Sequence, residues 1–281
     1  MEYIDLHLHS SFSDGTMTPA ELVREAAKKC IRGIAITDHD TIEGIDEALA
    51  ESNKNQVEIL AGVEISAYLD DMPMHLLGYG FHHKDPDLQH NLEKIQEARN
   101  ERNEGILAKL NSLGIQVTKD DLKMYSRSGQ TGRPHIASLL IKKKVVSSMD
   151  EAFSRYLRKG GLAYTERKRL AAADAIAMIS AAGGIAVLAH PLTMDQTMVT
   201  LPSVLLRLKE MKLQGVEAYY PIYSATVRQK IVALCQHMEL LVTGGSDFHG
   251  ATRNGTRLGG NNKSQRVPYE LLAALKKRLG N

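Results

Sequence analysis

The stretch Tyr3-Ile4-Asp5-Leu6-His7-Leu8-His9-Ser10-Ser11-Phe12-Ser13-Asp14 carries the most information in this chain. Apolar residues at positions 4, 6 and 8 alternate with polar ones, which is the period of a β-strand. His7 and His9 therefore point to the same side, where two imidazoles can bind one metal ion. The polar loop that follows brings Asp14 towards the same end of the strand. The pair alone is equally compatible with two surface histidines, so other parts of the chain must decide.

Length and composition indicate a globular protein. The 281 residues suffice for one large α/β domain or two small ones, and no apolar run is long enough to span a membrane. The chain enters a strand directly after acidic Glu2, so we expect no signal peptide. Cys30 and Cys235 are too few for a disulfide framework or a thiolate zinc site, and we expect two reduced core thiols in a cytoplasmic protein. Any metal must then be held by His, Asp and Glu.

Charge is unevenly distributed along the chain. The net charge is +2, but Lys123 to Arg169 contains twelve Lys or Arg and three Asp or Glu, a local charge of +9. A basic segment beside an acidic remainder suits a polyanionic substrate such as a phosphate ester or nucleic acid. A solvated basic surface explains the same pattern.

Strand and helix patterns alternate over most of the sequence. Besides the opening stretch, strands are expected at 33–37, 58–66, 74–80, 184–191, 215–220 and 240–244. Helices are expected at 18–30, 42–52, 171–182, 202–212, 226–238 and 268–279. The first of these helices begins with a capping box formed by Thr18 and Glu21, with Pro19 at its first position. This order predicts an α/β fold with a parallel sheet or a barrel.

The alternation stops between residues 85 and 168. No good strand pattern occurs there, and helices are expected at 85–113, 121–124, 135–143 and 150–157. We interpret 85–168 as a helical insertion that covers the active site of a main domain formed by 1–84 and 169–281.

Residues able to bind metal follow or lie on the predicted strands: Asp38, His39, Glu64, His75, His190, Asp247 and His249. The carboxyl ends of parallel strands meet on one face of such folds, so these side chains are expected to converge. Glu64 interrupts an apolar strand, where an unpaired carboxylate would be costly to bury. Three alternatives stay open: Asp38 as the cap of the next helix, His75 as a satisfied core histidine, and His190 as a turn residue before Pro191.

The remaining histidines, His82, His83, His90 and His237, are expected on the surface. The convergent set still exceeds what one closed metal site needs. Histidine and carboxylate ligands without thiolates suit two or three divalent ions in a hydrolytic centre.

Four signatures in order resemble the PHP (polymerase and histidinol phosphatase) family of metal-dependent phosphoesterases, and the resemblance covers essentially the whole chain. They are His7-Leu8-His9, Thr37-Asp38-His39, His190 in Ala-His-Pro, and Ser246-Asp247-Phe248-His249. The family's fold is a distorted (βα)7 barrel with up to three metal ions, and this fold is expected here.

The resemblance also implies which residues share each ion. The first ion would be held by His7, His9, Glu64 and Asp247, the second by Glu64, His75 and His190, and the third by Asp14, His39 and His249. Some relatives carry a histidine where this chain has Asp14. A carboxylate there favours Mn²⁺, with Fe²⁺ or Zn²⁺ as alternatives.

Two further segments resemble one branch of the family, which has nucleoside 3′,5′-bisphosphate phosphatase and 5′-to-3′ exoribonuclease activity. They are Thr131-Gly132-Arg133-Pro134-His135-Ile136-Ala137 and Tyr164-Thr165-Glu166-Arg167. The resemblance implies that Arg133, His135 and Arg167 bind substrate. The planar guanidinium of Arg133 matches phosphate oxygens, although an intradomain ion pair would also explain it. Lys142-Lys143-Lys144 is interpreted as a solvated helix end.

The expected activity is hydrolysis of a nucleoside 3′,5′-bisphosphate to the 5′-monophosphate and phosphate, of 5′-phosphorylated short RNA, or of both. The resemblance implies a hydroxide between the first two ions as the nucleophile, held by His7, His9, Glu64, His190 and Asp247. No membrane association and no obligate protein partner are indicated. A histidinol-phosphate phosphatase is the alternative enzyme, and a non-catalytic PHP module is the alternative from another class.

Overall fold

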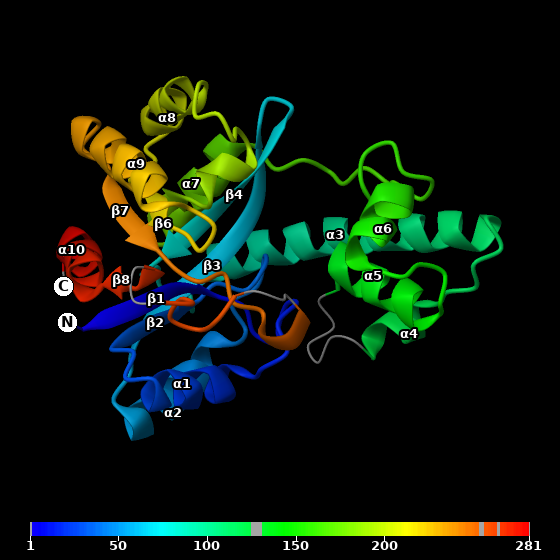
Figure 1. Ribbon diagram of the computed structural model, residues 1–281, viewed down its shortest axis with the longest axis horizontal. Helices are drawn as coiled ribbons and strands as arrows, with labels where there is room; N and C mark the ends of the chain where they lie inside the picture. Colours follow the sequence, from blue (N-terminus) through cyan, green and yellow to red (C-terminus); the bar gives the residue numbers. More distant parts are fainter. Residues whose placement is uncertain (1, 125–130, 253–255, 263–264, 281) are drawn as a thin grey trace.

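Eight strands form one sheet that curves into a nearly closed barrel (Figure 1). The strands are β1 (Tyr3–Leu8), β2 (Gly33–Ile36), β3 (Glu58–Leu69), β4 (Met72–Tyr79), β5 (Ile185–Leu188), β6 (Gly215–Tyr219), β7 (Leu241–Gly244) and β8 (Val267–Pro268). Their order in the sheet is β7-β6-β5-β4-β3-β2-β1-β8 in the computed structural model, which describes residues 2–124, 131–252, 256–262 and 265–280. The end of β1 also meets the segment after β7, where the His9 amide donates to the Phe248 carbonyl at 3.0 Å. This contact joins β1 to the segment after β7 and nearly closes the barrel.

The barrel is formed by a mixed sheet rather than by parallel strands alone. The neighbours β1/β2, β2/β3, β5/β6 and β6/β7 are parallel, but β4 runs antiparallel to both β3 and β5. The reason is a hairpin: only Asp70 and Asp71 separate β3 from β4, too few residues for the crossover that a parallel pair needs. The reversal places the amino-terminal half of β4, which carries His75, at the barrel end where the parallel strands finish.

Helices surround the outside of the barrel (Figure 1). They are α1 (Pro19–Lys28), α2 (Ile45–Asn55), α7 (Ala172–Ala181), α8 (Leu201–Glu210), α9 (Ala225–His237) and α10 (Tyr269–Leu279). The capping box of Thr18 and Glu21 is present at the start of α1, as predicted. The predicted second helix begins three residues later than expected, at Ile45, and β8 was not predicted because two residues are too few to show a period.

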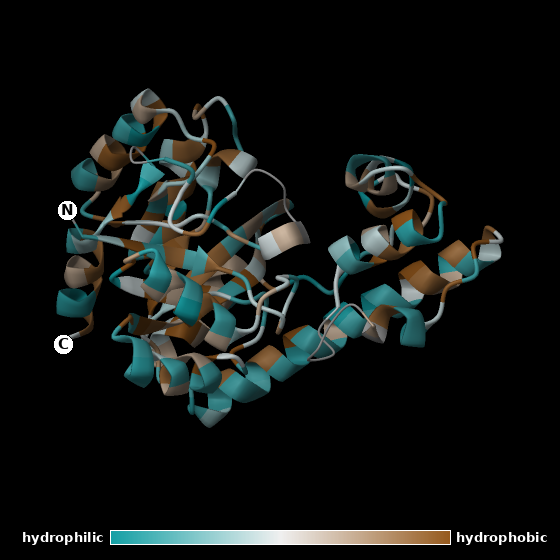
Figure 2. Ribbon diagram, turned by 60° about the horizontal axis from the view of Figure 1, so that its bottom comes forward, coloured by the Kyte–Doolittle hydropathy of each residue, from teal (hydrophilic) through white to brown (hydrophobic). Residues whose placement is uncertain are grey.

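Between β4 and α7, the described residues form helices joined by loops and contain no strand. This segment contains α3 (Pro86–Ser112), α4 (Lys119–Lys123), α5 (Arg133–Lys142), α6 (Met149–Ala152) and a π-helical turn, η1 (Phe153–Leu157). Helix α3 leaves the barrel and continues to the far group of helices, with hydrophobic and hydrophilic positions interspersed along its length (Figure 2). Residues 125–130 of the basic segment lie outside the described residues.

This helical segment, 85–168, has a hydrophobic core of its own. Its buried side chains include Ile106, Leu110, Leu140 and Leu157, which pack in a cluster separate from those of the barrel. In the barrel, β1 contributes Ile4 and Leu6 to one cluster and Leu8 to another that includes residues of α1, and the register of β1 with β2 shifts between Asp5 and Leu8. Two cores are therefore joined mainly through α3 and the return segment 164–170.

Several smaller predictions have clear outcomes. Cys235 is buried, but Cys30 is exposed, so its assignment to the core is wrong. It follows the last turn of α1 with a positive φ of 55°, outside the sheet and its packed helices. His82, His90 and His237 are exposed and His83 is half-buried in an ion pair with Asp46, as expected of surface residues. Among the helices described, none is both long enough and apolar enough to cross a membrane.

Candidate metal centre

The structure brings all nine predicted ligands together at one end of the barrel. His7 lies on β1 and His9 just after it, with ring centroids 5.2 Å apart. Four overlapping groups have candidate ligand atoms within 4.8 Å of one another: His7, Glu64 and His190; His7, His9 and Asp247; His9, Asp14, His39 and His249; and His39, Glu64 and His75. We call these nine residues the ligand cluster.

Glu64 occupies the middle of the ligand cluster. Its Oε1 lies 2.8 Å from His75 Nδ1 and 3.0 Å from His190 Nε2. Its Oε2 lies 3.4 Å from His7 Nε2 and 3.1 Å from His9 Nε2. The two oxygens of one carboxylate thus face two different sets of histidines, which is the geometry of a bridging ligand.

Asp247 and Asp14 each face a different part of the cluster. Asp247 Oδ1 is 3.5 Å from His7 Nε2 and 3.3 Å from His9 Nε2, so it shares those imidazoles with Glu64. Asp14 Oδ1 is 3.3 Å from His249 Nε2, and its Oδ2 is 3.8 Å from His39 Nε2. The four groups divide the residues differently from the three sets that the resemblance implied, since His190 falls with His7 and Glu64 whereas His75 falls with His39 and Glu64. One addition is that His9 also lies near the third set, with Nδ1 3.6 Å from Asp14 Oδ1.

The donor set fits divalent cations. Three buried nitrogens that face the carboxylates, His7 Nε2, His9 Nε2 and His39 Nδ1, have no hydrogen-bond partner among the described residues. Such orphaned acceptors inside a protein are costly unless a cation or a proton binds them. Six histidines and three carboxylates without a thiolate match the ligands of Mn²⁺, Fe²⁺ or Zn²⁺.

Electrostatics keeps the carboxylates ionised. Burial alone would raise the pKa of Glu64, but the neighbouring His75, His39 and His7 hold it well below its usual range. Asp247 behaves in the same way, its pKa being lowered chiefly by His7 and His9 against the effect of burial. Negative charge is thus concentrated where the imidazole nitrogens converge, which attracts a cation.

Two residues that sequence reasoning missed orient these ligands. Glu217, fully buried on β6, accepts a hydrogen bond from His7 Nδ1 at 2.9 Å and another from the His190 amide at 2.8 Å. The first bond leaves His7 Nε2 free to face the cluster. The Tyr220 hydroxyl donates to Asp247 Oδ2 at 2.6 Å. Glu217 interrupts an apolar strand just as Glu64 does, and this signal could have found it.

Asp38 has neither of the roles considered for it. It does not cap α2, whose N-cap is Gly44, and it is absent from the ligand groups of the described residues. Its carboxylate instead accepts hydrogen bonds from the Ser10 amide at 2.7 Å and the Ser13 hydroxyl at 2.5 Å. These bonds fold the loop after β1 back onto the barrel, and this loop carries Asp14.

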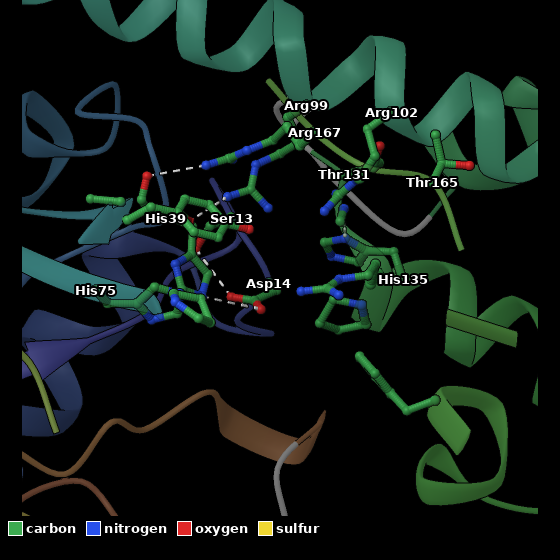
Figure 3. Close-up of a pocket in the computed structure, with 18 of the residues that line it drawn as sticks. Ser13, Asp14, His39, His75, Arg99, Arg102, Thr131, His135, Thr165 and Arg167 are labelled. Carbon is green, nitrogen blue, oxygen red and sulfur yellow. Dashed lines mark hydrogen bonds and ion pairs between the residues drawn. The ribbon is translucent and has the colours of Figure 1, made fainter. Parts of the chain in front are cut away.

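A cavity of about 220 Å³ lies between the ligand cluster and the helical segment (Figure 3). Asp14, His39 and His75 lie on its barrel side (Figure 3). The opposite side, here called the arginine wall, consists of Arg99, Arg102, Arg133, His135 and Arg167. Metal-ligating and cationic groups therefore face the same space.

The three residues predicted to bind substrate all lie on the arginine wall. Arg133 is half-buried with its guanidinium carbon 5.9 Å from the Phe153 ring centre, and no carboxylate of the described residues pairs with it. His135 Nδ1 accepts a hydrogen bond from the Gly132 amide at 2.9 Å, so its Nε2 carries the hydrogen of the neutral ring. Burial lowers the pKa of His135, which favours that neutral form.

Arg167 differs from Arg133 because two of its guanidinium nitrogens already contact other residues of the protein. One guanidinium nitrogen lies 3.0 Å from Asp40 Oδ2, and the other donates to the Ser66 carbonyl at 3.1 Å. Lys142, Lys143 and Lys144 are exposed at the end of α5, as predicted.

Arg99 and Arg102 were not predicted. They lie three residues apart on one face of α3 and are 9% and 8% exposed. Burial and the charges of Arg99, Arg133 and Arg167 lower the pKa of Arg102, and its Nε has no hydrogen-bond partner among the described residues. Of the four arginines of the wall, Arg99 and Arg167 pair with one buried carboxylate, Asp40, so the wall carries excess positive charge suited to an anion.

Comparisons with known proteins identify the family of this chain. Residues 5–158 match the PHP domain family, and the chain belongs to that family. It is 34% identical over 245 residues to a 5′-3′ exoribonuclease of Haemophilus influenzae, covering 87% of this chain and 89% of that protein. It is 32% identical over 260 residues to a 3′,5′-nucleoside bisphosphate phosphatase of Chromobacterium violaceum, covering 92% of this chain and 91% of that protein.

A solved structure has the same overall fold. It is a protein of Bifidobacterium adolescentis described as a metal-dependent phosphoesterase, with a TM-score of 0.88 and 29% identity over 99% of this chain and 96% of that one. The expected PHP barrel is thereby confirmed. The chain is a hydrolase that acts on phosphoester bonds.

Proposed function

We propose that this phosphoesterase hydrolyses nucleotides that carry more than one phosphate. Its substrate would be a nucleoside 3′,5′-bisphosphate, which yields the 5′-monophosphate and phosphate, a 5′-phosphorylated short RNA, or both. The single observation that supports this choice is the cavity with the ligand cluster on one side and the arginine wall on the other. The names of the two relatives, an exoribonuclease and a bisphosphate phosphatase, point to the same substrate class.

The ligand cluster would hold two or three divalent ions. We assign the first to His7, His9, Glu64 and Asp247, the second to Glu64, His75 and His190, and the third to Asp14, His39 and His249, with Mn²⁺ as the favoured metal. Ions there would polarise the phosphoryl oxygens of the ester and lower the pKa of a water molecule. Glu217 and Tyr220 would keep His7 and Asp247 in the required orientation.

The arginine wall would bind the phosphate that is not cleaved. Arg133 offers an unpaired fork of N–H donors, and His135 offers its Nε2 hydrogen beside it. Arg102 adds charge from the adjacent helix. A second phosphate held there would orient the ester towards the ligand cluster and exclude substrates that lack it.

We further propose that residues 1–84 and 169–281 act as the barrel domain and that 85–168 acts as an insertion covering the active site. The separate hydrophobic core of the helical segment supports this division. The insertion would complete the cavity, since the barrel alone supplies no arginine to the wall among the described residues that line it.

A substrate comparison with purified, Mn²⁺-loaded protein tests the function. The protein should release phosphate rapidly from adenosine 3′,5′-bisphosphate, mononucleotides rapidly from 5′-phosphorylated RNA, or both. It should release phosphate slowly from histidinol phosphate, which carries a single phosphate. His9→Ala should abolish turnover because it removes a ligand shared by two groups.

The matched control is His237→Ala, which removes an exposed histidine on α9. It should retain full activity. Preference for histidinol phosphate, or equal activity of His9→Ala and the parent, would contradict the proposal.

A further inference from the structure

One buried carboxylate outside the cavity lining connects the barrel to both ends of the helical segment. Asp40 is fully buried and follows His39 directly after β2. Arg99 of α3 donates to its Oδ2 through Nε at 3.2 Å and through a second guanidinium nitrogen. Arg167, on the return segment, reaches the same oxygen at 3.0 Å. The chain entering the helical segment and the chain leaving it are thus fixed to one atom.

The rest of Asp40 is held by the barrel and by α3. Its Oδ1 accepts from the Ser66 amide at 3.0 Å, and its own amide donates to the Glu64 carbonyl at 2.8 Å. Its carbonyl accepts from Gln96 Nε2 at 2.9 Å. Every polar group of Asp40 has a partner, so the residue cannot shift without breaking contacts to β3 or α3.

The backbone of Asp40 is also unusual. Its φ is +55°, a conformation that residues other than glycine adopt at a cost and that Asn and Asp tolerate best. The turn aims the carboxylate away from the ligand cluster while His39, its neighbour, faces Glu64 with Nδ1 3.0 Å from Oε2. A single short segment therefore carries a ligand of the cluster and the anchor of the helical segment.

We propose that Asp40 is a positioning residue that sets the distance between the ligand cluster and the arginine wall. It acts through Arg99 and Arg167, which fix α3 and the return segment, the two connections between the barrel and α5, the helix that carries Arg133 and His135. This inference rests on the proposed function, because it assumes that the wall binds the second phosphate. It assigns Arg167 to positioning rather than to direct recognition, since its donors are engaged by Asp40 and Ser66.

A purely electrostatic role of Asp40 predicts the opposite change in KM, so the direction of the change distinguishes the two roles. If Asp40 only neutralised the arginines, Asp40→Asn would make the wall more positive and would lower KM for a bisphosphate. If it positions the wall, the same change would raise KM, because the freed guanidiniums no longer hold the helical segment in place.

Asp40→Asn is the variant of choice because Asn keeps the shape and tolerates the positive φ. We expect kcat/KM for adenosine 3′,5′-bisphosphate to fall about 100-fold, because the displaced wall no longer orients its second phosphate. For p-nitrophenyl phosphate, which has no second phosphate, kcat/KM should change less than about threefold. Bound metal per chain should be unchanged.

Asp70→Asn is a matched control. Asp70 also has a positive φ, of 54°, and also pairs with an arginine, but the pair is exposed and its partner, Arg207, belongs to α8 rather than to the helical segment. This variant should leave both substrates unaffected. A lower KM for the bisphosphate in Asp40→Asn, or an equal loss on both substrates, would overturn the inference.

Amide hydrogen exchange tests the same inference without turnover. In Asp40→Asn, exchange should accelerate in α3 and in 164–170 but not in β1, β5 or β6. Should that variant fail to fold, Arg167→Gln takes its place, and faster exchange at both ends of the helical segment is again expected. Unchanged exchange would overturn the inference. If the parent enzyme does not cleave the bisphosphate, the proposed function fails, and the exchange result still decides the role of Asp40.

Discussion

The two sides of the cavity differ in how they are built. The ligand cluster is carried by strands and the residues directly after them, so its side chains are placed by the sheet itself. The arginine wall is carried by helices and a connecting segment that pack mostly on their own core. The difference teaches that the barrel alone fixes the ligand cluster, whereas the position of the arginine wall depends on contacts between two separately packed regions.

We expect the largest effect from a change at Glu64, the carboxylate in the middle of the ligand cluster. Glu64→Gln should lower kcat/KM by roughly 10³-fold, the upper end of the cost of removing one preorganised electrostatic group. The cause is that Glu64 faces both histidine sets. Metal analysis should show fewer ions per chain, and circular dichroism should show the fold retained. Full metal content with full activity would exclude the bridging role.

Glu217→Gln tests whether the hydrogen bond from His7 to Glu217 orients His7 within the ligand cluster. It should weaken metal binding about 10- to 100-fold, the usual cost of losing a residue that orients a ligand. The amide can still accept from the His190 amide but disturbs the hydrogen bond with His7 Nδ1. Competition with a chelator measures the change. A metal affinity equal to that of the parent would show that β1 alone orients His7.

Arg133→Gln addresses the other side of the cavity. KM for the bisphosphate should rise roughly tenfold, because charge-assisted hydrogen bonds to phosphate contribute a few kcal/mol at most. Metal content should stay the same. Arg158→Gln, at an exposed arginine of the same helical segment, is the control. Equal effects of the two changes would mean that general positive charge, rather than the wall, attracts the substrate.

Lys142→Gln should have the smallest effect. The residue is exposed at the end of α5, and surface substitutions usually change free energies by less than about 0.5 kcal/mol, or about twofold in kcat/KM. Steady-state kinetics with the bisphosphate and with RNA checks this. A large loss with RNA alone would extend the binding surface beyond the cavity.

Local patterns predicted the ligand cluster well because strands impose a short, regular spacing. The alternation in β1 placed His7 and His9 on one side, and the polar residues after apolar runs marked the other strand ends. The reversal of β4 was missed because strand direction depends on the two-residue turn at Asp70 and Asp71, not on the pattern of the strand. Asp38 was misjudged because its partners, Ser10 and Ser13, are distant in sequence.

The sequence by itself determined the class of fold and the order of the residues able to bind a metal ion, because strand period and strand-end position are local properties. It also identified the basic helical segment and, through resemblance, Arg133, His135 and Arg167. Only the tertiary structure decided that Arg99 and Arg102 join them, that Glu217 orients His7, and that Arg167 pairs with Asp40. The physical reason is that ion pairs and buried hydrogen bonds join residues far apart in the sequence, such as His7 and Glu217 at 210 positions, whereas a local pattern reflects only near neighbours.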